Sequence, residues 1–402
     1  MAANILIIEN NLSGHRGVYL KWIAEAFYEK GNKVYVLLPE KYLSNDIVRS
    51  INSRNVIFEG FKGDGSWYMR LFNRMGLIGS QLINHIESRS IYRKITKEIN
   101  IEYVFLPSID NVLYALAIFG SPFKDCLFSG ITMRPDFHYK KCSVNVPDSK
   151  VVWLKEIVFL KFLKNNYLKC LLTLDEPLYL YCKNNKIGKV KFLPEPATRL
   201  RYKTDESGLE VSLDHERRMV LVFGGLSQRK GITYLLNACK DLLKIHNLQL
   251  VLAGKADNET YQFLMKDEFD DLRSDGYIII LNRFVSDQEE AMLFSRAYIC
   301  WLGYIGHYRP SGVLITAAKY NVPVISTDEG IIGWQVDRYQ LGISLDVKNI
   351  GRLREAIQEI CIDREKHNKY KENSKAAFLD NTFENAKNTV NSTIMQVDDR
   401  AQ

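Results

Sequence analysis

Two loops in the second half of the chain carry residues that could bind phosphate. The first, LSQRKG, follows the apolar run MVLVFGG and places Lys230 just before a run of helical periodicity. The second, HYRPSGVL, places Ser311 and Gly312 at the start of another helical run, which leads to VPVIST. Helix N-termini carry partial positive charge and unpaired N–H donors. An ammonium beside two such turns suits a ligand with two phosphates, so we expect a nucleoside diphosphate.

Each of these residues also has a plainer reading. A cation at the start of a helix opposes the helix dipole, so a purely structural role explains Lys230 less naturally than anion binding does. An ordinary N-cap, worth about 1 kcal/mol, explains Ser311 without any ligand. The two roles of Ser311 are compatible, because Gly312 leaves room for close approach to the backbone.

The first half offers weaker candidates for an active site. His15 lies in the loop SGHRG after the first apolar run, where Gly14 would let backbone approach a phosphate or a sugar. His138 lies in GITMRPDFHYK after a later run, and it is either an active-site residue or a packed histidine. The pair Asp175–Glu176 precedes Pro177, which favours a helix cap over a metal or acid–base site.

The order of the elements predicts the fold that positions these residues. Apolar runs such as NILIIE, KVYVLL, LQLVLAG and YIIILNRF alternate with helical stretches in both halves, as in parallel sheets covered on both faces. We therefore expect an α/β protein of two Rossmann-like doubly wound domains facing a central cleft. The predicted boundaries are 1–195 for the first domain, 196–216 for a linker, 217–375 for the second domain, and 376–402 for a C-terminal helix. One arrangement that the sequence allows is packing of this C-terminal helix on the first domain.

Composition narrows the class of protein. The chain has 402 residues, 46% hydrophobic and 25% charged, typical of a globular protein, and seven scattered cysteines without a C-x-x-C pair, which indicates a reducing compartment. Neither a secretory signal nor an apolar span of about eighteen residues is evident, so a cytoplasmic location is expected. No metal or cofactor is predicted.

Charge is unevenly divided between the two halves. Residues 1–200 hold 28 Lys and Arg against 18 Asp and Glu, a net of +10; the totals of 54 and 47 leave 26 against 29 in residues 201–402, a net of −3. The segment VVWLKEIVFLKFLKNNYLKC reads first as an amphipathic core helix, with peripheral contact to the inner face of a membrane as the alternative. No nucleic-acid-binding module is recognisable.

With these residues in place, the second half resembles the donor domain of retaining, family 4-type glycosyltransferases of GT-B fold. The resemblance covers roughly residues 215–360 through FGGLSQRKGITYLLNA, LVLAG, AYICWLGY and SGVLITAAKYNVPVIST, in that order. The first half resembles the acceptor domain more loosely, through NILIIE and SGHRG. The resemblance implies that Lys230 contacts the donor diphosphate, that Ser311 and Gly312 cap a phosphate, and that Arg283–Val285 line the base pocket. The full expected set is Lys230, His138 and His15 as catalytic residues, and Gly14, Gly224, Gly225, Ser227, Arg229, Lys230, Arg283, Phe284, Val285, Tyr308, Arg309, Ser311, Gly312, Val313 and Thr316 at the donor.

The chain also departs from the family pattern. The family arginine five residues before the lysine is Gly225 here, and the two carboxylates of the E-x7-E pair fall on Tyr308 and Thr316. Either Arg229, Arg283 or Arg309 takes over charge neutralisation, or activity is lost. The resemblance implies a glycosyltransferase that moves a sugar from a nucleotide sugar to a glycan or lipid-linked acceptor with retention, in cell-surface polysaccharide synthesis. The alternatives are a non-catalytic nucleotide-sugar-binding or partner protein of the same fold, and an inverting GT-B transferase or sugar-nucleotide epimerase.

Overall fold

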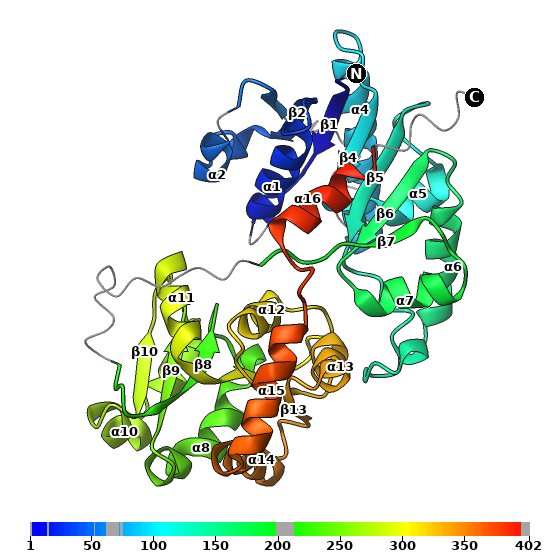
Figure 1. Cartoon of the computed structure of the whole chain (residues 1–402). Coiled ribbons are helices and arrows are strands. Elements are labelled where there is room, and N and C mark those ends of the chain that lie inside the picture. Colours follow the sequence, from blue (N-terminus) through cyan, green and yellow to red (C-terminus); the bar gives the residue numbers. More distant parts are fainter. Residues whose placement is uncertain are drawn as a thin grey trace. The chain divides into compact units, whose positions relative to one another are not determined.

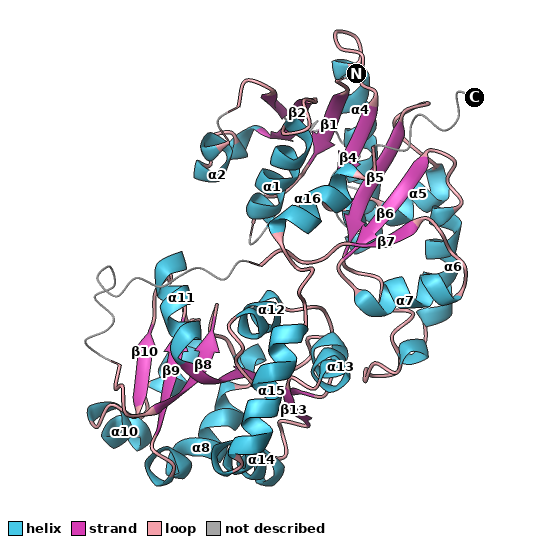
Figure 2. Ribbon diagram, viewed as in Figure 1, coloured by secondary structure: helices cyan, strands magenta, loops and turns pink. Residues whose placement is uncertain are grey.

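The protein divides into two compact units, which a computed structural model describes for residues 2–13, 16–51, 53–61, 72, 75–197 and 213–394. Unit 1 contains residues 1–138, 148–194 and 383–402, and unit 2 contains residues 139–147 and 195–382. Each unit is a parallel sheet with helices on both faces (Figure 2). Both sheets match the expected doubly wound α/β class.

Unit 1 is built on a seven-stranded sheet of order β3-β2-β1-β4-β5-β6-β7 (Figure 1). Its strands are β1 (Asn4–Ile8), β2 (Lys33–Pro39), β3 (Val56–Phe61), β4 (Tyr103–Leu106), β5 (Leu127–Thr132), β6 (Leu168–Thr173) and β7 (Val190–Phe192). Its helices are α1 (Arg16–Tyr28), α2 (Asp46–Ser50), α4 (Gly76–Ile95), α5 (Leu113–Phe119), α6 (Val152–Leu163), α7 (Glu176–Asn184) and α16 (Phe383–Asn391), and its 3₁₀ turns are η1 (Glu40–Tyr42) and η2 (Ile109–Asn111). A further 3₁₀ turn, η3 (Lys140–Cys142), belongs to unit 2. Strand order reverses between β1 and β4: β1 pairs in parallel with β2 on one side and with β4 on the other, and Ile5 has a partner in both strands.

The two faces of this sheet have separate cores. Helices α4, α5, α6 and α7 contribute to one core, and α1 and α16 contribute to the other. The C-terminal helix α16 packs on α1 through the buried Ala386 and Val390 (Figure 1). Lys387 reinforces the contact, with its ammonium 2.7 Å from Glu29 and 3.3 Å from Glu25.

Unit 2 is built on a six-stranded sheet of order β10-β9-β8-β11-β12-β13. Its strands are β8 (Arg218–Phe223), β9 (Leu248–Ala253), β10 (Ile278–Leu281), β11 (Ala297–Leu302), β12 (Val324–Thr327) and β13 (Gly342–Leu345). Its helices are α8 (Ile232–Ile245), α9 (Asn258–Leu264), α10 (Asp270–Ser274), α11 (Asp287–Arg296), α12 (Gly312–Lys319), α13 (Gly330–Tyr339), α14 (Ile350–Ile362) and α15 (Arg364–Ala376), with 3₁₀ turns η5 (Gln228–Lys230) and η6 (Asp267–Phe269). Every residue of β9 is buried, as a central strand covered on both faces requires.

Local sequence explains most of these helix boundaries. Ser286 and Glu289 form a capping box that starts α11, and Asn349 caps α14 through the backbone N–H of Arg352. Helix α9 ends at Leu264, because Lys266 is extended between α9 and a 3₁₀ turn. The last two helices, α15 and α16, are separated by a turn in which Phe378 has a positive φ of 55°.

A short segment from the first half of the chain, residues 139–147, belongs to unit 2. Tyr139 and Val144 form a small core with Ile331. The Gly330 N–H donates to the Asn145 carbonyl at 2.7 Å, and the Trp334 indole N–H donates to the Cys142 carbonyl at 3.0 Å. No sequence pattern indicated this excursion.

Among the described residues, no helix combines the length and the apolar character needed to cross a bilayer. Six of the seven cysteines are buried.

Candidate anion-binding site of unit 2

The loops predicted to bind phosphate follow the two strands between which the order of the unit 2 sheet reverses. β8 pairs in parallel with β9 on one side and with β11 on the other. The loop at 224–231 follows β8, and the loop at 303–311 follows β11. Ligands of doubly wound sheets bind beyond the carboxyl ends of the strands at such a switch point.

Lys230 lies in η5 and is almost entirely buried. Its ammonium donates to the Phe223 carbonyl and, at 3.1 Å, to the Tyr304 hydroxyl, and it lies 4.9 Å from the centre of the Tyr304 ring. A Cβ at Gly224 would lie 3.4 Å from this ammonium. The glycine therefore leaves one side of the ammonium without a covering side chain, and its φ of 87° favours glycine at this turn.

Backbone contacts join the two loops. The Trp301 indole N–H donates to the Lys230 carbonyl at 2.7 Å, and the Ile305 N–H donates to the Arg229 carbonyl at 2.7 Å. Gly231 has a φ of 63°, and a Cβ there would collide with the Gly303 carbonyl. Glycine at position 231 thus permits the close approach that fixes the two loops together.

Tyr304 and His307 connect the lysine to the second turn. Their rings lie 5.4 Å apart, and His307 lies close to the backbone of Pro310, next to Ser311. Burial, followed by the nearby charge of Arg229, lowers the pKa of His307; Arg309 and Lys230 lower it further. The positive charges of Arg229, Arg309 and Lys230 near His307 create an environment that attracts an anion.

Ser311 is the N-cap of α12 and is 7% exposed. Its side chain makes no capping hydrogen bond, so the ordinary N-cap role does not account for its hydroxyl. Gly312 is exposed, and a Cβ there would lie 3.3 Å from a carboxylate oxygen of Glu195. A carboxylate already lies beside this helix N-terminus, where an anion is favoured.

The other expected donor residues are spread over the same edge of the unit 2 sheet. Gly225, Arg229 and Arg309 are exposed, while Ser227 precedes η5 in extended backbone. Tyr308 accepts the Ile331 N–H at 3.2 Å through its backbone, and Val313 and Thr316 are half-buried on α12.

The segment expected to line the base pocket follows β10. Phe284 is 85% exposed and Val285 is buried. Arg283 pairs with Glu289 at 2.9 and 2.5 Å, and this hydrogen bonding lowers the pKa of Glu289 to about 2. Arg283 is therefore engaged by a carboxylate of α11.

The first-half candidates have different outcomes. Gly14 and His15 lie outside the described residues, and their expected role stays a prediction. His138 is fully buried, with its Nε2 atom 3.1 Å from Asp175. Asp175 caps α7 by accepting the Leu178 N–H at 2.8 Å, which confirms the helix-cap reading of this acidic pair. The burial of His138 is typical of a packed histidine, and its catalytic role stays a prediction.

The unit 1 switch point carries an acid that sequence reasoning missed. Glu9 directly follows β1, is 1% exposed, and accepts hydrogen bonds from the Ser108 hydroxyl at 2.6 Å and the Asn11 N–H at 3.1 Å. Burial raises its pKa, although Arg16 lies 3.9 Å away. Glu9 closes the apolar run NILIIE, and its polarity at a strand end was the available signal. Tyr304 lies in the motif AYICWLGY and His307 in HYRPSGVL, but neither residue was predicted to belong to the site.

No cluster of three or more His, Cys, Asp or Glu side chains that could hold a metal occurs in the part of the chain that the structure describes.

Comparison with known proteins relates the second half of the chain to a protein family. Residues 206–377 match the model of glycosyl transferases group 1. The match covers less than half of the chain, and this part resembles the glycosyl transferases group 1 domain. An uncharacterized glycosyltransferase of Methanocaldococcus jannaschii is 27% identical over 124 residues, which is 30% of each protein. The match thus spans less than a third of that relative's length.

Solved structures similar to the whole chain share the GT-B glycosyltransferase fold. Sucrose-phosphate synthase of Thermosynechococcus elongatus matches with a TM-score of 0.66 at 16% identity and covers 98% of both chains. WaaG, a glycosyltransferase involved in lipopolysaccharide biosynthesis, matches with a TM-score of 0.61 at 12% identity, over 97% of this chain and 99% of its own. Anabaena HepE in complex with UDP-glucose matches with a TM-score of 0.63 at 12% identity, over 98% and 99%. At these identities the likeness establishes the fold alone.

Proposed function

We propose that the protein transfers a sugar from a nucleotide sugar to a hydroxyl of a glycan or lipid-linked acceptor, with retention at the anomeric carbon, in cell-surface polysaccharide synthesis. The observation that carries the proposal is the set of cations at the unit 2 switch point. Arg229, Arg309 and Lys230 all lower the pKa of His307 through their positive charge, and His307 lies in the loop that leads to the N-terminus of α12. Preorganised positive charge of this kind stabilises a leaving diphosphate.

The reaction requires stabilisation of negative charge on the leaving diphosphate, which this site can provide. The bond between the anomeric carbon and the phosphate oxygen breaks, and negative charge builds on the diphosphate while the sugar gains oxocarbenium character. Lys230 and the backbone N–H groups at Ser311 and Gly312 would hold that charge. The acceptor oxygen then bonds to the same face of the sugar, and its proton passes to the leaving phosphate, so atoms and charge balance.

The family carboxylates have no counterpart in this scheme. Tyr308 and Thr316 occupy their positions, and neither is a base near neutral pH. Proton transfer to the leaving phosphate removes the need for a protein base. Arg229 and Arg309 are exposed at the site edge and can neutralise the charge that the family arginine, here Gly225, would otherwise meet.

The nucleotide base would lie beyond the phosphates, toward the loop after β10. Phe284 presents an exposed ring there, which suits stacking on a planar base. HepE binds UDP-glucose, so UDP and UDP-glucose are the first probes for this chain. For the acceptor, the excess of positive charge in residues 1–200 supports an anionic glycan or lipid-linked substrate and peripheral contact with the inner face of a membrane.

A thermal-shift screen of UDP, GDP, ADP and their glucose conjugates tests the proposal. A ligand that binds only the folded state raises the melting temperature by mass action. At a ligand concentration a hundred times the dissociation constant, it adds about 2.7 kcal/mol to the free energy of unfolding. We expect at least one nucleoside diphosphate to raise it, and the Lys230→Ala variant to lose the shift. If none of the six compounds shifts the protein, the proposal is wrong.

The rival function is nucleotide-sugar binding without transfer. The glycine at 225 and the protein acceptors that already engage the Lys230 ammonium favour it. Incubation with UDP-glucose and an acceptor mixture, followed by NMR of the anomeric proton, separates the functions. A retained α-linkage supports the transferase, an inverted linkage indicates an inverting enzyme, and binding without product indicates the rival.

A further inference from the structure

The hydrogen bond between Lys230 and Tyr304 leaves the hydroxyl hydrogen of Tyr304 for another acceptor. An ammonium carries three N–H donors and no lone pair, so in this contact of 3.1 Å Lys230 donates and the Tyr304 oxygen accepts. The hydrogen of the Tyr304 hydroxyl must therefore point elsewhere. Among the residues that the structure describes, the bond from Lys230 is the only hydrogen bond of this hydroxyl.

Burial makes an unused donor unfavourable at this position. Tyr304 is 5% exposed and Lys230 is 6% exposed. A donor that is buried without a partner loses its hydrogen bonds to water and gains none in return. The Tyr304 hydroxyl is therefore suited to an acceptor that a ligand brings into the site. Beside an ammonium, an anionic acceptor is favoured over a neutral one.

The ammonium also strengthens this hydroxyl as a donor. A hydroxyl oxygen that accepts a hydrogen bond from a cation is polarised, and the hydrogen bond that its own O–H donates becomes stronger. The ammonium lies 4.9 Å from the centre of the Tyr304 ring, so the two side chains are held together by two contacts. A phosphate group carries several strong acceptor oxygens, and one group can accept from both donors.

Two glycines of the loop after β8 leave room for a ligand beside this pair. A Cβ at Gly224 would lie 3.4 Å from the Lys230 ammonium, and a Cβ at Gly225 would meet nothing within 4 Å. Any larger residue at these two positions would place a side chain on this side of the loop. The absence of both side chains therefore gives a phosphate access to the ammonium and the hydroxyl.

We propose that Tyr304 donates a hydrogen bond to the diphosphate of the ligand, next to the Lys230 ammonium, so that the loops after β8 and β11 each contribute one side-chain donor. This role rests on the proposed function, because its ligand is the nucleoside diphosphate of the same site. It differs from a purely structural role, in which Tyr304 only holds the ammonium in place and does not touch the ligand.

Titration calorimetry with UDP, GDP or ADP, whichever raises the melting temperature most, tests the proposal. Tyr304→Phe removes only the hydroxyl and keeps the ring beside Lys230 and His307. We expect the affinity for the diphosphate to fall by about tenfold, which is the effect of one hydrogen bond to a charged group. The melting temperature without ligand shows that the variant is folded.

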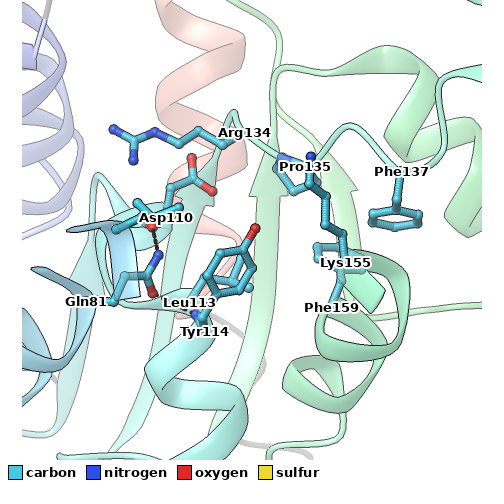
Figure 3. A pocket seen from close by; sticks show the side chains of 10 residues that line it. Gln81, Asp110, Leu113, Tyr114, Arg134, Pro135, Phe137, Lys155 and Phe159 are labelled. Atoms are coloured by element: carbon cyan, nitrogen blue, oxygen red, sulfur yellow. Dashed lines mark hydrogen bonds between the residues drawn. The ribbon is translucent and has the colours of Figure 1, made fainter. Parts of the chain in front are cut away.

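Tyr114→Phe is the matched control. The Tyr114 side chain lines a pocket of unit 1 together with the cations Arg134 and Lys155 (Figure 3). It is thus a second tyrosine hydroxyl close to positive charge, in the other unit. Its removal should leave the affinity for the diphosphate at the wild-type value. A loss in Tyr114→Phe without a loss in Tyr304→Phe would move the diphosphate to unit 1 and overturn the proposal.

A double-mutant cycle with Lys230→Met separates a direct donor from a holder of the lysine. If Tyr304 donates to the phosphate, Tyr304→Phe still weakens binding in the Lys230→Met background, by about threefold, because a hydroxyl without the neighbouring cation is a weaker donor. If Tyr304 only positions the ammonium, the second substitution has no further effect, and that result overturns the proposal.

The same measurements distinguish this proposal from the proposed function. Wild-type affinity in Tyr304→Phe overturns the role of Tyr304 alone and leaves the nucleotide site in place. Failure of the wild-type protein to bind UDP, GDP and ADP overturns the proposed function and the role of Tyr304 with it.

Discussion

The two units place opposite chemistry at the same topological position. In unit 2 the loops after β8 and β11 carry three cations, and burial together with their positive charge lowers the pKa of His307. In unit 1 the loops after β1 and β4 enclose Glu9 and Ser108, and burial raises the pKa of Glu9. The strand order reverses in the same way in both sheets. A shared topology therefore decides where a site lies, and a few loop side chains decide which charge it accepts.

The largest effect on this charge difference between the units is expected from removing the buried ammonium of unit 2. Lys230→Met should lower kcat/KM for transfer by about a hundredfold, because one preorganised donor to a developing negative charge is worth that much. Lys244→Met is the matched control, since the exposed Lys244 forms a surface ion pair with the exposed Asp275. Steady-state rates with the donor found in the screen measure both. A wild-type rate in Lys230→Met would remove this lysine from the mechanism.

Adding a cation should sharpen the contrast. Gly225 stands where the family has arginine, and a Cβ there meets nothing within 4 Å. Gly225→Arg should tighten UDP binding by about tenfold, which corresponds to one added charged hydrogen bond. Gly188→Arg, at an equally open site of unit 1, controls for net charge. Equal titration curves for Gly225→Arg and the wild type would show that no phosphate reaches this turn.

His307 offers a smaller, pH-dependent effect. A bound diphosphate should raise the lowered pKa of this histidine, so that UDP binding takes up a proton and weakens as pH rises through the histidine range. The expected change is about threefold, or half a pKa unit. Calorimetry in buffers of different ionisation enthalpy detects the uptake. His307→Gln should abolish it, whereas the exposed His215→Gln should not.

The smallest effect concerns the acid of unit 1. The pKa of Glu9 is raised on folding, so its contribution to stability is fully present below the unfolded pKa and is lost as pH rises through the folded pKa. The free energy of unfolding of Glu9→Gln should therefore increase relative to that of the wild type from acid to neutral pH. Urea denaturation at several pH values measures this difference. The exposed Glu98→Gln should give a flat difference, and a flat result for Glu9→Gln would contradict the assignment.

Much of the fold was predictable from local pattern. The apolar runs that became β1, β2, β8, β9, β11 and β12 were foreseen because strands buried on both faces are apolar throughout. The start of α11 follows from local sequence, since the capping residue Ser286 acts within its own turn. β13 and α13 were not foreseen, because their helical or extended preference is weak and tertiary packing decides it.

The site was predictable only in part, for the same physical reason. Lys230 and Ser311 stood out because they follow apolar runs and open helices. Tyr304 and His307 did not, because their role depends on a ring contact across a loop rather than on spacing. The ion pair between Arg283 and Glu289 depends on side-chain conformation, so the sequence pattern did not predict it either.

By itself the sequence determined the two α/β units, the phosphate-type turns of the second unit and the resemblance to group 1 glycosyltransferases, because periodicity, glycine and capping residues act over a few neighbours. Only the tertiary structure decided that the Lys230 ammonium is buried against Tyr304, that His138 is packed in a core, and that Glu9 is an enclosed acid. Burial and charge proximity arise between segments far apart in the chain, and they set both the pKa of a group and its access to a ligand.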